Sequence, residues 1–278
     1  MAVAVGAALL APATAFAGFF TPEAGGSPNA NSIRTLYIIT LVIAALVLAV
    51  VWGALGWSLI RYRAKKGRVA AQIHGNTPLE IGWTVGAALI LVVLTTMTFV
   101  KLGGIENPPP TAAGGFQGST SLVADAGVPK APGGKSITIC VTGRQYIWRF
   151  TYAPCSRNAL GQVYSYEEMY APAKTTVILD IQSTDVIHSW WIPALGGKAD
   201  AVPGYDNYTW FQAPRAGATY IGQCAELCGR NHANMTARVH VLAPTRYQAW
   251  LDRQKSLINQ ANKQVQSERR ALQKSGDL

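Results

Sequence analysis

The residues with the clearest potential for chemistry lie in one short segment toward the C-terminal end. It reads Cys224-Ala-Glu226-Leu-Cys228-Gly-Arg-Asn-His232-Ala-Asn-Met235. Two thiols, one imidazole and one thioether form a soft ligand set that suits copper or zinc. The thioether favours copper, because zinc sites rarely use methionine. A single-copper blue site needs only one cysteine, so the two cysteines predict two thiolates that bridge two metals.

A bridged pair of metals needs a second histidine, and His188 is the candidate. It lies in the segment Asp185-Val-Ile-His188-Ser-Trp190, between a β-branched run and a turn, where a loop of a β-sandwich can present it. Taken alone, a Cys-x3-Cys pair is more often a disulfide or a buried pair, and a lone histidine is more often structural. The joint spacing of all these groups favours the metal centre.

The elements that must position these ligands are predicted over residues 135–244. Short alternating or β-branched runs recur there, separated by turn residues, at residues 136–140, 174–180 and 237–242. This pattern predicts a β-sandwich or a Greek-key barrel.

The tail over residues 245–278 predicts a helix. Apolar residues recur in it every seven positions, at Leu251, Ile258, Val265 and Leu272. The complementary heptad position is polar, which disfavours a coiled coil. A basic amphipathic helix that lies on a partner or on lipid headgroups fits better.

The composition indicates membrane-spanning sequence, because only 14% of the residues are charged and 49% are hydrophobic. Two uncharged runs, Leu36 to Ile60 and Ile81 to Val100, are each long enough to cross a hydrocarbon core of about 30 Å. We expect transmembrane helices over residues 36–60 and 81–102. The basic loop over residues 61–80 is then cytoplasmic by the positive-inside rule, and both ends lie outside.

The remaining segments carry weaker signals. Residues 1–17 resemble a signal peptide without the usual basic start, the alternative being a short apolar N-terminus. Residues 103–134 form a Gly/Pro-rich linker. The net charge is +10, yet charges nearly balance in the predicted folded domain, which argues against a nucleic-acid binder. Cys140 and Cys155 lie outside the copper segment and are candidates for a disulfide, with two buried free thiols as the alternative.

Five segments together resemble the cytochrome c oxidase subunit II family. The first is the motif Cys-x-Glu-x-Cys-x3-His-x2-Met itself. The others are Asp185-Val-Ile-His188-Ser-Trp190, Asp200-Ala-Val-Pro-Gly204, Trp210-Phe-Gln212 and His74-Gly-Asn-Thr-Pro-Leu-Glu80-Ile-Gly-Trp83-Thr84. The resemblance covers roughly residues 36–102 and 135–244 in order. It implies an N-terminal two-helix transmembrane hairpin and an all-β cupredoxin-like Greek-key sandwich. The amphipathic C-terminal helix lies outside the resemblance and is predicted from its own pattern.

The resemblance also implies a set of metal ligands. Cys224 and Cys228 would bridge both coppers of a dinuclear CuA centre, and His188 and His232 would each bind one. Weak axial ligands would come from Met235 and the backbone carbonyl of Glu226. The Glu226 carboxylate would hold a magnesium ion shared with subunit I.

The family's activity sets further expectations. Such a subunit accepts electrons from cytochrome c and passes them to haem a in subunit I. There, haem a and CuB serve the reduction of oxygen to water, coupled to proton translocation. The resemblance implies subunits I and III as partners and a multi-pass location in a bacterial plasma membrane, with the copper domain on the outer face of the lipid bilayer.

Three residues are expected to act in electron or proton transfer. Tyr146 stands where the family's electron-accepting tryptophan does, and Trp148 would share its face if the segment is a strand; the alternative is that both fill the core. Asp185, Asp200 and Asp206 are the best candidates for steering a basic donor. Glu80 is expected to help take up protons, the alternative being a charge that favours the helix dipole. The chain departs from the family pattern at two positions. One is Tyr146, and the other is Tyr205, where an arginine is common in the family.

Four rival interpretations remain in view. A copper-free quinol oxidase subunit would lack the ligands that this chain has, and the copper domain of nitrous-oxide reductase lacks the two-helix anchor. A thioredoxin-fold copper chaperone or thiol oxidoreductase would carry its histidine far downstream of the cysteines. The last is a membrane-tethered β-sandwich held by disulfides. No Cys-x-x-Cys-His is present in the sequence, so any haem-bearing donor is a separate protein or subunit.

Overall fold

The computed structural model describes residues 20–23, 25–64, 67, 69, 72–118, 128–152 and 162–275. The chain divides into two compact units, residues 34–103 and residues 1–33 with 104–278. The expected signal peptide over residues 1–17 lies outside the described residues.

The first unit is built from two long helices, α2 (Pro28–Arg61) and α3 (Thr77–Glu106). Both are long and apolar enough to cross a membrane, with 34 and 30 residues. Each begins before the apolar run that predicts it. Pro28 supplies the fixed φ that suits a first helical position, and Asn76 Oδ1 accepts a hydrogen bond from Leu79 N (3.2 Å) as a cap. The hydroxyls of Thr84, Thr96 and Thr98 within α3 donate to carbonyls one turn earlier, which satisfies them in an apolar setting.

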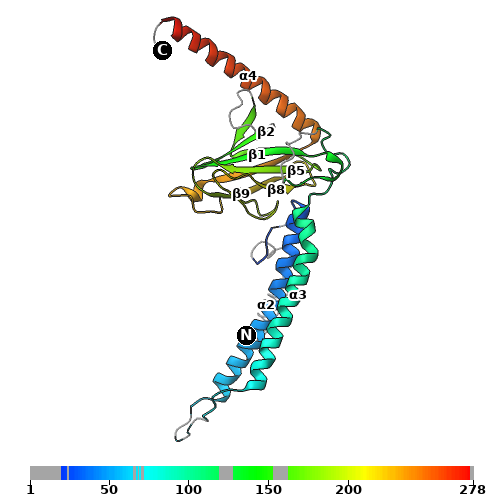
Figure 1. Ribbon diagram of the computed structural model, residues 1–278, viewed down its shortest axis with the longest axis vertical. Coiled ribbons are helices and arrows are strands. Elements are labelled where there is room, and N and C mark those ends of the chain that lie inside the picture. Colours follow the sequence, from blue (N-terminus) through cyan, green and yellow to red (C-terminus); the bar gives the residue numbers. More distant parts are fainter. Residues whose placement is uncertain are drawn as a thin grey trace, which may run out of the picture. The chain divides into compact units, whose positions relative to one another are not determined.

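The second unit is a β-sandwich with a C-terminal helix (Figure 1). One sheet has the order β3-β2-β1-β5-β8, a second β4-β10-β9, and a short third pairs β6 with β7. The strands are β1 (Ile137–Arg144), β2 (Ile147–Tyr152), β3 (Val163–Tyr166), β4 (Glu168–Pro172), β5 (Val177–Ser183), β6 (His188–Trp190), β7 (Ala199–Ala201), β8 (Asn207–Phe211), β9 (Thr219–Gln223) and β10 (Thr236–Leu242).

Alternating side chains of the two main sheets form one core. Ile139 and Phe150 from the first sheet join Met169 and Val239 from the second in a single buried cluster. β1 pairs with β5 in parallel and with β2 in antiparallel orientation. The predicted fold class, a two-helix hairpin, a cupredoxin-like sandwich and a C-terminal helix, is confirmed.

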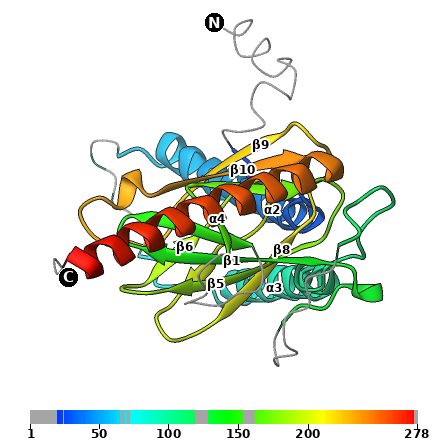
Figure 2. The ribbon, with the colours of Figure 1, turned by 90° about the horizontal axis from the view of Figure 1, so that it is seen from above.

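The C-terminal helix, α4 (Pro244–Ser275), lies along the sandwich through its first turns (Figure 2). Tyr247 and Trp250 are buried, and Trp250 stacks on Tyr170 with ring centroids 4.5 Å apart. The later apolar positions Val265 and Leu272 are 61% and 45% exposed. Only the first part of the predicted amphipathic face is therefore covered by the sandwich.

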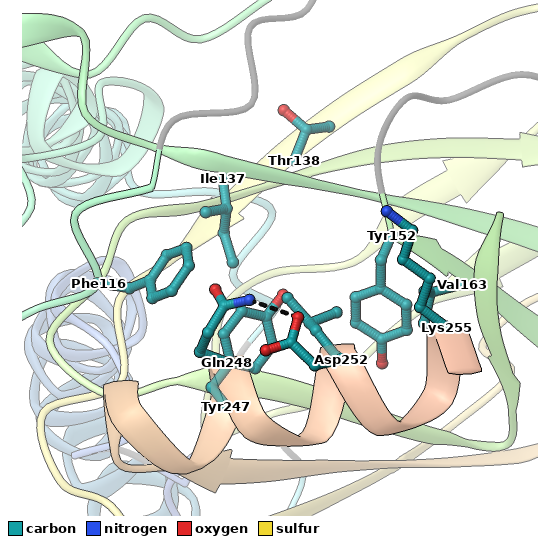
Figure 3. A pocket seen from close by; sticks show the side chains of 10 residues that line it. Phe116, Ile137, Thr138, Tyr152, Val163, Tyr247, Gln248, Asp252 and Lys255 are labelled. Atoms are coloured by element: carbon teal, nitrogen blue, oxygen red, sulfur yellow. Dashed lines mark hydrogen bonds between the residues drawn. The ribbon is translucent and has the colours of Figure 1, made fainter. Parts of the chain in front are cut away.

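A cavity of about 220 Å³ lies between α4 and the first sheet (Figure 3). Its lining is largely apolar, with Ile137, Val163 and Tyr247 among the residues that face it. Asp252 accepts a hydrogen bond from Gln248 at the rim (2.9 Å).

The four cysteines fall into two groups, as expected. Cys224 and Cys228 are free thiols, whereas Cys140 is bonded in a disulfide. Cys155, the partner expected for it, lies outside the described residues, so this pairing stays a prediction.

Candidate metal centre

The predicted ligands come from two loops at one end of the sandwich. His188 opens β6, and the Cys224–Met235 segment connects β9 to β10 and contains the short helix η3 (His232–Asn234). Strand pairing sets Thr236 opposite Gln223, so this segment closes as a hairpin. Cys224 N donates to Met235 O (2.8 Å), and Ala225 N donates to Ser189 O (2.9 Å). The second bond ties the cysteine loop to the strand of His188.

The sulfur and nitrogen atoms converge in two Cys–His pairs. Cys224 Sγ lies 3.8 Å from His188 Nδ1, and Cys228 Sγ lies 3.7 Å from His232 Nδ1. The ligand atoms of His188, Cys224 and Cys228 all lie within 4.8 Å of one another. This arrangement gives each cysteine a histidine of its own within one cluster.

Two weaker donors complete the predicted set. Cys228 Sγ lies 4.0 Å from Met235 Sδ, and Cys224 Sγ lies 3.3 Å from the backbone oxygen of Glu226. Met235 is fully buried, whereas the Glu226 side chain is exposed. The structure thus brings together all six residues that the sequence singled out, with Glu226 contributing through its main chain.

The electrostatics of the site separate the two thiols. Burial by itself raises the pKa of Cys224, but hydrogen bonds from His188 and the neighbouring backbone outweigh burial and lower it. Burial and the charge on Cys224 both raise the pKa of Cys228. Burial by itself lowers the pKa of His188, yet its contacts with Cys224 and Asp185 raise it. Ionising both adjacent thiols therefore requires a positive charge beside them, which a bound metal would supply.

Asp185 orients the buried imidazole of His188. Its Oδ1 lies 2.9 Å from His188 Nε2, which leaves Nδ1 facing Cys224. Its Oδ2 accepts a hydrogen bond from Gln145 N (2.7 Å). These bonds outweigh the effect of burial, which would raise the pKa of Asp185, and lower it. Asp185 therefore stays a carboxylate that fixes the ring.

Gln145 is a positioning residue that sequence reasoning missed. Its Nε2 donates to the Cys228 carbonyl (2.6 Å), a contact between residues 83 positions apart. Nothing in its local sequence signals such a contact. For Asp185, by contrast, the i, i+3 spacing to His188 was a usable signal.

Two glycines make room for this packing. A Cβ at Gly143 would lie 2.9 Å from His188 Cδ2 and 3.1 Å from the Trp148 ring. Gly229 has φ +133, and a Cβ there would lie 2.6 Å from the Tyr146 hydroxyl. The Tyr146 hydroxyl thus lies close to the backbone that follows Cys228.

The two aromatic candidates do not share a face, which corrects the expectation that they do. Tyr146 is half-buried in the turn between β1 and β2, whereas Trp148 in β2 is 0% exposed and packs edge-on against His188 with centroids 5.9 Å apart. The two-residue alternation of a strand does not hold across a turn residue. Only Tyr146 of the two reaches solvent.

Glu80 lies in the first turn of α3, as expected. Its Oε1 accepts a hydrogen bond from Asn76 N (3.2 Å). This contact is the one a helix-capping carboxylate makes, so the geometry accounts for a structural role. A role in proton transfer stays a prediction.

The donor chemistry fits copper. Two thiols, a buried and a half-buried imidazole, and a buried thioether form a soft set enclosed by apolar core residues. The free state of both thiols is the one a metal requires. A site built only for a disulfide would place neither histidine against the sulfurs.

Both parts of the chain match known protein families. Residues 137–242 match the family described as cytochrome C oxidase subunit II, periplasmic domain, and residues 15–100 match its transmembrane domain. The "Cytochrome c oxidase subunit 2" of Alkalihalophilus pseudofirmus is 35% identical over 227 residues, which are 81% of this chain and 59% of that protein. The protein of the same name from Cereibacter sphaeroides is 30% identical over 265 residues, 84% of this chain and 78% of that one. The chain thus spans less than two thirds of the first relative and more than three quarters of the second.

A solved structure, the periplasmic domain of subunit II of cytochrome oxidase of Bradyrhizobium japonicum, is 31% identical. It covers 47% of this chain and 99% of its own, with a TM-score of 0.41.

The transmembrane match and the two long apolar helices make this a membrane protein. The periplasmic match contains all the residues that converge on the cluster. The Cereibacter relative extends the match over both parts of the chain, because it aligns with 84% of this chain and over 78% of its own length. The chain belongs to the cytochrome c oxidase subunit II family.

Proposed function

We propose that this chain is the electron-accepting subunit of a cytochrome c oxidase. It takes electrons from cytochrome c at a dinuclear copper centre and passes them to haem a in subunit I. The observation that carries the proposal is the pair of Cys–His contacts, 3.8 Å and 3.7 Å, within one cluster.

The residues of the cluster would share the work of holding two coppers. Cys224, Cys228, His188 and His232 would hold the copper pair, with Met235 and the Glu226 carbonyl as weaker donors. Bound in this way, a copper pair takes up and releases single electrons. The chain keeps the ligands fixed, because Asp185 holds one imidazole and Gln145 holds the Cys228 carbonyl.

Tyr146 is proposed as the surface contact through which electrons arrive. Its hydroxyl lies against the backbone after Cys228, and the side chain is half-buried, so it connects solvent to the ligand loop. Trp148 would act from within the core, where it contacts His188.

The rest of the complex follows from the family. We infer that the loop over residues 61–80 is cytoplasmic and that the copper domain over residues 135–244 faces the outer side of a bacterial plasma membrane, with residues 1–17 as a signal peptide. Subunits I and III are the expected partners, with haem a and CuB in subunit I. The exposed Glu226 carboxylate would hold a magnesium ion shared with subunit I. Oxygen reduction there would be coupled to proton translocation, with Glu80 near the point of proton uptake.

Copper analysis of the purified oxidase tests the proposal. We expect two coppers in this chain and an electron paramagnetic resonance spectrum of one electron shared over both. Cys224→Ser removes a bridging ligand and should abolish this spectrum and oxygen consumption together. His240→Gln changes a histidine outside the site and serves as the control that keeps both. A shared two-copper spectrum that survives in Cys224→Ser would refute the assignment.

A further inference from the structure

A second cavity, of about 420 Å³, opens beside the turn that carries Tyr146. Two arginines, two threonines, Gln145, Ile147 and Tyr166 line it. Strand register explains why they meet. Arg149 stands opposite Thr142 on β1 and Tyr166 on β3, and Arg144 stands opposite Ile147. Residues that pair directly share one face of a sheet, and this face is the one that turns away from the core. We call this cavity the arginine groove.

The arginine groove is lined by positive charge, and one of its hydrogen-bond donors has no acceptor in the described structure. None of the described residues that line it is acidic, and the ion pairs in the described part of the chain involve neither Arg144 nor Arg149. Arg149 lies 4.8 Å above the Tyr164 ring, and its Nε is buried with no hydrogen-bond partner in the described structure. A buried charged donor without an acceptor is costly. Guanidinium groups pair most strongly with carboxylates, which they bind through two parallel hydrogen bonds.

The acids near the groove do not line it. Asp185 already accepts hydrogen bonds from Gln145 N and Val186 N and contacts His188, so its carboxylate is committed to the metal site. Glu167 follows Tyr166 in the chain and is exposed, but it does not line the groove. The charge on the lining of the groove itself is therefore that of the two arginines.

The groove is physically continuous with the ligand loop. Gln145 lines the groove and donates through its side chain to the Cys228 carbonyl (2.6 Å). The next residue is Tyr146, whose hydroxyl faces the backbone of Gly229. A protein that seats charged side chains in the groove is thereby held directly over the surface path to the cysteines.

We propose that the arginine groove receives carboxylate side chains of the electron donor, so that the donor has an acidic docking face. This differs from the basic donor expected from the sequence. The inference rests on the proposed function, because it names the class of protein that delivers the electrons. Complementary charge at a docking face speeds association and makes it depend on salt.

The test uses the purified oxidase with this chain in place. Two soluble c-type cytochromes serve as donors, one with an acidic and one with a basic face around the haem edge. The second-order rate of donor oxidation is measured at low and at high salt. We expect the acidic donor to react faster at low salt and to slow as salt rises. Arg144→Glu should lower its low-salt rate about tenfold, and Arg149→Gln should lower it about threefold.

Arg215→Glu is the matched control. Arg215 follows β8, and the last residue of β8, Phe211, pairs with Val177 at the start of β5. The other end of β5, Ser183, pairs with Gly143, which precedes Arg144. The same charge reversal there, at the far end of the sheet, should leave the rate within about twofold, since steering falls off over a Debye length of about 10 Å.

Two outcomes overturn the inference: a wild-type oxidase that prefers the basic donor at low salt, or an acidic-donor rate that Arg144→Glu does not change. Copper content and oxygen consumption driven by a small redox mediator are measured on the same samples. Their absence in the wild-type oxidase would refute the proposed function itself. Their presence alongside either overturning outcome would refute only the acidic docking face.

Discussion

Asp185 illustrates how a single residue outside the ligand set can shape the metal site. It touches no sulfur, but it contacts the Nε2 of His188 and so decides which ring nitrogen faces Cys224. Outer partners of this kind usually contribute 10- to 100-fold to metal affinity. The same carboxylate anchors the Gln145 turn, so one side chain fixes both loops that flank the ligands.

Replacing Asp185 should therefore weaken copper binding without removing a ligand. We expect Asp185→Ala to lower the apparent copper affinity about 10- to 100-fold, measured by competition with a chelator. Asp185→Asn keeps an acceptor for His188 Nε2 and should recover most of the loss. Equal affinities in the alanine variant and the wild type would show that packing alone holds His188 in place.

The ligand set was predictable at this scale, whereas the network behind it was not. Cys224, Cys228, His232 and Met235 lie in one loop, so their spacing alone predicted a shared site. The contact between Gln145 and Cys228 joins residues 83 positions apart and depends on how two loops meet. Tyr146 and Trp148 were predicted to share a face on the condition that both lie in one strand. In the structure, Tyr146 lies in the turn between β1 and β2, and only Trp148 lies in a strand.

Among the elements, β4, β10 and α4 form one connected edge of the sandwich. Glu168 on β4 pairs with Arg238 on β10 (2.7 Å) and contacts His240. Tyr170 stacks on His240 with centroids 5.1 Å apart, and its ring also stacks on Trp250 of α4. The ion pair and the helix are thus joined through one tyrosine.

The pKa of Glu168 determines how the stability of this edge should change with pH. Partial burial by itself raises its pKa, but hydrogen bonds and charge from His240 and Arg238 outweigh burial and lower it. A carboxyl whose folded pKa is lowered stabilises the fold above its unfolded pKa, and this contribution is lost as pH falls through the folded pKa.

Glu168→Gln should accordingly lower the free energy of unfolding by about 0.5–1 kcal/mol at neutral pH, since the pair is partly exposed. The difference from the wild type should vanish at acidic pH, where the native carboxyl is protonated. Urea unfolding of the purified chain, followed by tryptophan fluorescence over a pH series, measures both. Glu167→Gln alters the adjacent exposed carboxylate and controls for net charge. A deficit that persists unchanged into acid would mean that the carboxylate charge is not its source.

The elements differ in how well the sequence predicts them. The strands that contain the long β-branched runs, β1, β5 and β10, were expected close to where they occur, because alternation over that length is informative. β6 and β7 have three residues each, too few to show a period. Helix α2 begins at Pro28, well before the apolar run, because Pro28 suits a first helical position and Asn29 and Ala30 are buried at its start.

For the molecule as a whole, the division into a membrane unit and a sandwich unit would separate the proposed proton uptake from the proposed electron transfer. All six predicted copper ligands belong to the second unit, whereas Glu80 belongs to the first. Changes at Glu80 should therefore leave the copper site intact. This separation makes the proposed role of Glu80 testable by itself.

Glu80→Gln should slow oxygen consumption several-fold while copper content stays at the wild-type level. The amide keeps a hydrogen-bond acceptor for Asn76 N but can no longer carry a proton. Turnover and copper are measured on the same purified oxidase. If turnover equals that of the wild type, the carboxylate only caps α3, a contribution of a few tenths of a kcal/mol.

The ligand loop is held by one hydrogen bond within itself, from Cys224 N to Met235 O, and by two hydrogen bonds with other parts of the sandwich, namely Ser189 O and Gln145 Nε2. The positions of Ser189 and Gln145 are set by the folding of the domain. The conformational entropy of ordering the loop is therefore lost when the chain folds, and little remains to be lost when a metal arrives. Metal binding to this domain should resemble insertion into a finished site, in contrast to small metal-dependent domains in which binding and folding are one event.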